Sequence, residues 1–217
     1  MTDRLVLAID LSSPRGVIAV VRGETLLHEA VFQSERSHNA QLFAPLAAAL
    51  EVMGREPAVL VVGTGPGSYT GVRISIAAAQ GVALSRGWPL VGWSSISAVD
   101  LPHYQVLGDA RRGQFYRAQV KNGVLLAAPA IITPDEARAA AEEADTWVTL
   151  DAKAPLALEN IAVHSPDAAQ LGRLIARLSE SELSQASAPI LEPVYLQEAF
   201  ITVAKKAGKH VPVHRDR

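Results

Sequence analysis

The stretch Gly63-Thr-Gly-Pro-Gly-Ser-Tyr-Thr-Gly-Val-Arg73 decides how the rest of the chain is interpreted. It follows an apolar run, residues 59–62, and precedes a long apolar segment, residues 72–84. A strand, a glycine-rich turn and a helix in this order can present free backbone amides to an anion. Gly65, Gly67 and Arg73 are therefore candidate residues for binding a nucleotide. The spacing matches neither a P-loop nor a dinucleotide-binding turn, and so slightly favours the alternative, a purely structural turn that binds nothing.

A single carboxylate is a further candidate. Asp10 ends the apolar run 5–9 and precedes a turn that contains Ser12 and Ser13. Several nucleotide-binding folds hold a metal-bound phosphate with a carboxylate in this place, but a lone aspartate more often only caps its turn. His38 stands without a second histidine one helical turn later, where position 42 is leucine, so we expect no metal site there.

Composition limits the class of protein. The 217 residues are 49% hydrophobic, which suffices for one large domain or two small lobes with an ordinary core. The net charge of -2 provides no overall attraction to nucleic acid. The absence of cysteine excludes disulfides and zinc sites built on cysteine. The N-terminus does not resemble a signal peptide, and glycine and proline interrupt the uncharged stretches, so we expect a soluble, cytoplasmic protein without a membrane segment.

The order of the predicted elements indicates two lobes. Three short-linked strands predict an antiparallel meander, which alternating helices and strands then follow, so we expect a mixed sheet with helices packed on it. The pattern restarts near Leu101, with a turn at 108–113, a hairpin at Asn122-Gly123 and predicted helices near 134–144 and 166–178. We therefore place an N-terminal lobe at 1–100, a second, smaller lobe at 101–200 and a basic tail at 201–217.

Two predicted helices in the first lobe, residues 40–53 and 72–86, carry more apolar surface than one sheet can cover. The first has a core stripe and a second stripe of small residues; the second has no clean polar face, which predicts burial on all sides. The surplus indicates an interface with a partner, unless it packs against the chain's own second lobe. The predicted interface residues are Ala44, Ala48, Val52, Val72, Ile76, Ala79 and Ala83.

Three segments together resemble one family. They are Leu7-Ala-Ile-Asp-Leu-Ser-Ser13, Val62-Gly-Thr-Gly-Pro-Gly-Ser-Tyr-Thr-Gly-Val-Arg-Ile74 and Gly108-Asp-Ala-Arg-Arg-Gly-Gln-Phe-Tyr116. The middle segment is the most specific. On these residues the chain resembles the TsaB (YeaZ) family, whose members are partner subunits in making threonylcarbamoyladenosine on transfer RNA.

The resemblance implies an α/β fold of the actin-like ATPase (ASKHA) superfamily, built from two ribonuclease-H-like lobes. It also implies a non-catalytic subunit that dimerises with a TsaD-like enzyme, with ATP or ADP and a metal ion on that enzyme rather than on this chain. Transfer RNA would then be met only through the complex. The resemblance leaves open whether a TsaE-like ATPase docks and whether the chain forms a homodimer alone. A small ATP-binding phosphotransferase or ATPase that uses Asp10, the glycine turn and Arg73 is the alternative from another class.

Overall fold

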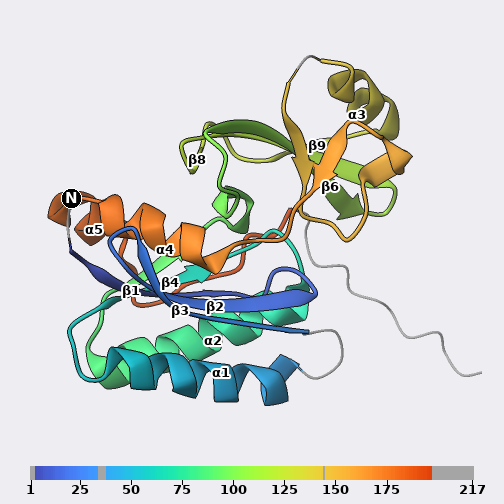
Figure 1. The fold of residues 1–217 in the computed structure, drawn as a ribbon. Coiled ribbons are helices and arrows are strands. Elements are labelled where there is room, and N and C mark those ends of the chain that lie inside the picture. Colours follow the sequence, from blue (N-terminus) through green and yellow to red (C-terminus); the bar gives the residue numbers. More distant parts are fainter. Residues whose placement is uncertain (1–2, 34–37, 144, 197–217) are drawn as a thin grey trace, which may run out of the picture.

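The computed structural model describes residues 3–33, 38–143 and 145–196. The described chain folds into two β-sheets with helices packed against them (Figure 1). The predicted basic tail, 201–217, lies outside the described residues.

The first sheet has the strand order β3-β2-β1-β4-β5. The meander β1–β2–β3 is antiparallel, and β4 and β5 continue the sheet in parallel with β1. This confirms the mixed sheet predicted for the first lobe. The strands are β1 (Leu5–Asp10), β2 (Arg15–Arg22), β3 (Thr25–Gln33), β4 (Val59–Gly63) and β5 (Leu90–Trp93).

The two predicted helices lie side by side on one face of this sheet, as Figure 1 shows. They are α1 (His38–Met53) and α2 (Tyr69–Arg86), each starting slightly before its predicted position. The side chain of Ser68 caps α2 by accepting from the backbone N–H of Gly71, and Gly87 ends the helix in a left-handed conformation with φ 67°. The core stripe predicted for the first helix consists of Leu42, Leu46, Leu50 and Met53; three of these side chains are buried in the core, and Leu50 is half-buried beside them.

The second sheet has the order β11-β10-β6-β7-β8, and β9 also pairs with β7. Its strands and helices repeat the connectivity of the first lobe, since β6 and β7 form an antiparallel hairpin and β10 and β11 run parallel to β6. The elements are β6 (His103–Arg111), β7 (Gln114–Lys121), β8 (Val124–Leu125), β9 (Ala130–Ile132), α3 (Pro134–Ala141), β10 (Trp147–Thr149) and β11 (Ile161–Val163), with short 3-10 helices at Ser95–Ser97 and Pro155–Ala157.

The last two helices return to the first lobe. α4 (Ala168–Arg177) packs on the face of the first sheet opposite to α1 and α2 (Figure 1), and α5 (Glu180–Ala186) follows it. Leu171 and Ile175 of α4 are completely buried in a core cluster with Val6 and Ala8 of β1. Part of the sequence assigned to the second lobe therefore completes the core of the first.

One local feature was misplaced in the sequence-based prediction, and two others were missed. The turn predicted for 108–113 is mostly strand, because β6 continues to Arg111 and pairs with β7, leaving only a tight turn before Gln114. Neither β9 nor α5 was predicted. The chain after Ser179 is polar, yet Ser179 forms a capping box with Glu182, which is a local signal for a helix start.

Candidate functional site

The glycine-rich turn uses its backbone donors within the chain. The N–H of Gly65 donates to Ser95 Oγ over 3.0 Å, and the N–H of Ser68 donates to the carbonyl oxygen of Ser12 over 2.6 Å. The N–H of Gly71 donates to Ser68 Oγ over 3.1 Å. These amides are thus committed to internal hydrogen bonds, which supports the structural interpretation of the turn rather than an anion site.

Two of the glycines allow the turn to lie directly on the end of β1. A Cβ on Gly67 would collide with the carbonyl oxygen of Ser12, and one on Gly71 would collide with that of Leu11. Both obstacles are backbone atoms, which cannot rotate away as a side chain can. The glycine spacing is therefore explained by a close backbone contact between the turn and the segment that follows β1.

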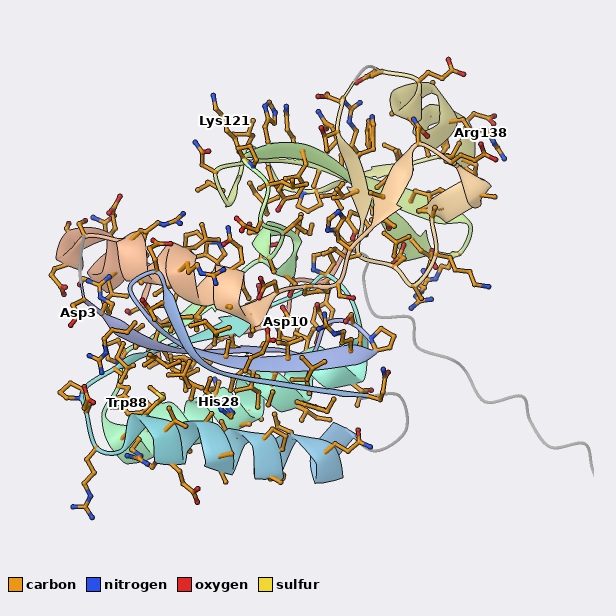
Figure 2. The ribbon with its side chains drawn as sticks, in the orientation of Figure 1. Asp3, Asp10, His28, Trp88, Lys121 and Arg138 are labelled. Atoms are coloured by element: carbon orange, nitrogen blue, oxygen red, sulfur yellow. The ribbon has the colours of Figure 1, made fainter. Side chains whose placement is uncertain are left out.

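Asp10 is buried at the end of β1, and Figure 2 shows it on the side of the first sheet where the second lobe lies. Its Oδ1 accepts from the backbone N–H of Ser12 over 2.8 Å and from Ser12 Oγ over 2.6 Å. A Cβ on Gly63 would collide with Oδ2 of Asp10 and with Ser95 Oγ, so β4 also packs closely on this carboxyl. Burial raises the pKa of Asp10, although hydrogen bonds from Ser12 and Ser95 oppose the shift.

Arg73 lies apart from this cluster and points to the surface. Its guanidinium stands 4.2 Å from the centre of the Tyr69 ring and 5.8 Å from that of Tyr195. Its Nε donates to the Tyr195 hydroxyl over 2.8 Å. The structure thus brings Asp10, Gly65 and Gly67 together and turns Arg73 toward two tyrosines; a role of these four residues in binding a nucleotide stays a prediction.

An extended C-terminal segment, residues 187–196, lies along the glycine-rich turn. The N–H of Ala188 donates to the carbonyl oxygen of Leu90, and the N–H of Val194 donates to that of Thr64 over 2.8 Å. The contact of this segment with the turn was not predicted, since the two stretches are more than 100 residues apart in the sequence.

The structure divides the predicted partner interface in two. Val72, Ile76, Ala79 and Ala83 are buried in the chain's own core on the sheet-facing side of α2 and cannot be reached by a partner, which corrects their assignment. Ala44 and Val52 are exposed and Ala48 is half-buried. The expectation that α2 is buried on all sides was also wrong, because Leu84 is 88% exposed.

The outward sides of α1 and α2 nevertheless form an exposed surface of mostly apolar and small residues. We name it the helical face, and it comprises Phe43, Ala44, Ala47, Ala77, Gly81 and Leu84. Two of these are large apolar side chains with more than half of their surface exposed, Phe43 at 60% and Leu84 at 88%. The alternative that the surplus apolar surface packs against the chain's own second lobe does not hold for these residues.

Within residues 3–33, 38–143 and 145–196, no three histidine, cysteine, aspartate or glutamate side chains gather in a way that could hold a metal ion. His38 opens α1, but its side chain lies outside what the structure describes. The described helices include none with the length and hydropathy needed to cross a membrane.

Comparison with known proteins gives the chain a family. The model of the family described as TsaD, tRNA N6-adenosine threonylcarbamoyltransferase, matches residues 26–188. The tRNA threonylcarbamoyladenosine biosynthesis protein TsaB of Bacillus subtilis is 35% identical over 131 residues, which are 55% of this chain and 57% of that protein. TsaB of Escherichia coli is 38% identical over 76 residues, which are 30% of this chain and 33% of that protein. The matched region thus spans slightly more than half of the Bacillus subtilis protein and a third of the Escherichia coli protein.

Solved structures support the fold. YeaZ from Pseudomonas aeruginosa superposes with a TM-score of 0.64 at 22% identity, over 89% of this chain and 100% of that one. A second Pseudomonas aeruginosa structure, described as similar to the peptidase YEAZ, gives a TM-score of 0.66 at the same identity and coverage. The predicted fold class, two lobes with mixed sheets flanked by helices, is confirmed. Because the family model covers most of the chain, the chain belongs to the TsaD family, and the named relatives that it resembles within that family are TsaB proteins.

Proposed function

We propose that this chain is an accessory subunit in the biosynthesis of threonylcarbamoyladenosine at position 37 of transfer RNA. It would pair with a TsaD-like enzyme through the helical face, and the enzyme would transfer the threonylcarbamoyl group. ATP or ADP and the metal ion would belong to that enzyme, and transfer RNA would meet this chain only within the complex. A cytoplasmic location follows from the same role.

The observation that carries the proposal is the exposed helical face in a chain of this family. Leu84 and Phe43 present large apolar side chains to solvent. The alanines and Gly81 have small side chains or none, so the backbones of both helices lie close to the molecular surface there. Contiguous exposed apolar surface of this kind is typical of protein interfaces. Small residues let a second pair of helices approach closely, which favours a helix-to-helix contact with a dry centre.

The environment of the glycine-rich turn supports an accessory role rather than independent catalysis. The buried Asp10 is bound by Ser12, and the turn amides of Gly65 and Ser68 are already engaged. For an aspartate to hold a metal-bound phosphate it would have to be charged and open to the ligand. Asp10 is instead enclosed, and burial disfavours its charged form.

The test is a binding measurement with a pair of matched variants. Leu84→Glu places a charge on the helical face, while Leu126→Glu places the same charge on an exposed leucine of the second lobe. Each variant is checked for an unchanged melting temperature and titrated with the TsaD-like enzyme of the same organism. We expect Leu84→Glu to abolish binding and to stop reconstituted transfer RNA modification, because a buried unpaired charge is costly. Equal affinity of both variants would contradict the proposed interface.

A second pair of variants tests α1, as the first pair tests α2. Val52 and Val163 are exposed to almost the same extent, 50% and 52%, on α1 and β11. Val52 is a predicted interface residue that lies beside the helical face, so Val52→Glu is expected to weaken binding while Val163→Glu leaves it unchanged.

Sizing of the chain without the enzyme shows whether the same surface also supports a homodimer, and adding a TsaE-like ATPase shows whether a third subunit docks.

A further inference from the structure

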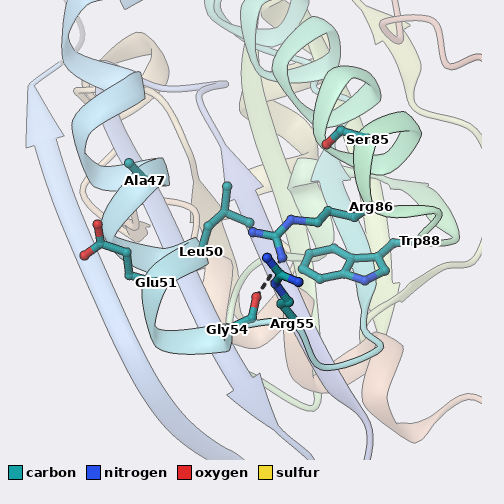
Figure 3. A pocket seen from close by; sticks show the side chains of 8 residues that line it. All are labelled: Ala47, Leu50, Glu51, Gly54, Arg55, Ser85, Arg86 and Trp88. Atoms are coloured by element: carbon teal, nitrogen blue, oxygen red, sulfur yellow. Dashed lines mark hydrogen bonds between the residues drawn. The ribbon is translucent and has the colours of Figure 1, made fainter.

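An open pocket lies between the C-terminal ends of α1 and α2, with a volume of about 810 Å³ (Figure 3). Leu50 of α1 and Trp88, which follows α2, provide its apolar wall. Two guanidinium groups, those of Arg55 and Arg86, stand in the same pocket. Of the described residues that line it, Glu51 alone is acidic, so this lining carries a net positive charge.

The two arginines differ in how they are held. Arg86 Nη1 donates to the carbonyl oxygen of Gly54 over 2.7 Å, and its guanidinium lies 5.4 Å from the centre of the Trp88 ring. These contacts fix the group and leave its other N–H donors available. Among the described residues, Arg55 makes no ion pair and no hydrogen bond through its side chain; Glu51, one helical turn earlier, does not come within ion-pair distance of it.

A position near a helix C-terminus is favourable for both arginines, but it engages the N–H donors of only one of them. Both helices end at the pocket, and a cation near a helix C-terminus is favourable because the last carbonyls are unsatisfied. Arg86 fulfils this role directly by binding the carbonyl oxygen of Gly54. No carbonyl of the described residues accepts a hydrogen bond from Arg55, so its N–H donors remain available to a group from outside the described chain.

We propose that this pocket receives a carboxylate side chain of the partner enzyme that sits on the helical face, with Arg55 and Arg86 as its guanidinium ligands. The inference rests on the proposed function, in which the enzyme binds the helical face. The pocket adjoins that face, because Ala47 belongs to both and Ser85 of the pocket lining is the neighbour of Leu84. A partner that covers the helical face also covers the mouth of the pocket. Excluding water there strengthens a guanidinium–carboxylate contact, which is further favoured by the planar fork of arginine.

The experiment compares charge reversal in the pocket with charge reversal elsewhere. Arg55→Glu and the milder Arg55→Ala are measured against Lys153→Glu, which changes an exposed cation of the second lobe. Binding of the full chain to the TsaD-like enzyme is titrated at low and at high ionic strength. We expect Arg55→Glu to weaken binding at least about tenfold at low ionic strength and to flatten its salt dependence, with an unchanged melting temperature. Arg55→Ala should have an intermediate effect and Lys153→Glu none.

The outcomes separate this inference from the proposed function. If Leu84→Glu abolishes binding while Arg55→Glu binds within about twofold of the unaltered chain and with the same salt dependence, the enzyme occupies the helical face and the pocket inference is overturned. If Arg55→Glu weakens binding but Leu84→Glu does not, the pocket is supported and the proposed interface fails. If Arg55→Glu converts a homodimer to a monomer without changing binding of the enzyme, the occupant is a second copy of this chain, and an enzyme carboxylate is overturned.

Discussion

The backbone N–H of Ser68 donates to the carbonyl oxygen of Ser12 over 2.6 Å, joining the glycine-rich turn to the segment that follows β1. The two stretches are 56 residues apart in the sequence, as their numbers show. This contact places Gly67 against the same carbonyl oxygen and so explains why the turn needs a residue without a side chain there.

Gly67→Ala should destabilise the protein by about 1–3 kcal/mol, because the new Cβ must push aside the backbone of Ser12. Gly81→Ala is the matched control, since a Cβ at Gly81 meets nothing within 4 Å. Alanine in an exposed helix interior should instead raise the free energy of unfolding by about 0.5–1 kcal/mol. Denaturant unfolding measures both changes. A Gly67→Ala variant as stable as the unaltered chain would show that the turn can move away from β1.

Asp10→Asn should make stability less dependent on pH. Burial raises the pKa of Asp10 above 3.8 in the folded state, so this carboxyl favours folding most at pH values below 3.8. That contribution is lost as the pH rises through the folded-state pKa, because the folded state then holds a buried charge. Asparagine does not titrate, and its Oδ1 can still accept from Ser12.

The measurement for this prediction is the free energy of unfolding of both proteins from acid to neutral pH. As the pH rises, the free energy of unfolding of Asp10→Asn should increase relative to that of the unaltered chain. The difference should become constant above the folded-state pKa of Asp10. A difference that stays the same across the whole range would mean that Asp10 has the same pKa in the folded and unfolded chain.

Leu171→Ala should destabilise the first lobe although residue 171 follows the second sheet in the sequence. The side chain is completely buried between α4 and the first sheet, and such truncations cost about 2–5 kcal/mol. Arg177→Ala on the same helix is the control. It removes an ion pair with Glu24 in which both side chains are more than a third exposed, so the expected cost is at most about 1 kcal/mol. Similar losses for both variants would contradict the packing of α4 on that sheet.

Tyr195→Phe should loosen the C-terminal segment without unfolding the protein. The change removes the hydroxyl that accepts from Arg73 but keeps the ring near Tyr69. Hydrogen exchange at the backbone N–H of Val194, which donates to Thr64, reports on the segment directly. We expect faster exchange in Tyr195→Phe and a larger increase in Tyr195→Ala, which also loses the ring contact. Unchanged exchange in both would show that the tyrosine does not hold the segment in place.

Local patterns in the sequence were enough to predict most elements of the first lobe. The alternation of apolar runs and turns predicted β1 to β5, because strand formation and turn chemistry depend on neighbouring residues. Asn122 and Gly123 predicted their hairpin for the same reason, and both adopt positive φ, 50° and 74°. The core stripe of α1 followed from helical spacing alone.

Only the tertiary structure decided which surfaces are covered. Apolar residues occur on every side of α2. Ala79 is nevertheless buried and Leu84 exposed, because the sheet and α1 cover one side of the helix. The sequence carries no signal that α4 returns to the first sheet or that Tyr195 meets Arg73, since contacts between distant segments depend on the whole fold. The sequence alone therefore determined the strands and helices of the first lobe and the resemblance to a family, while long-range packing decided that Asp10 is enclosed and that the helical face is open to solvent.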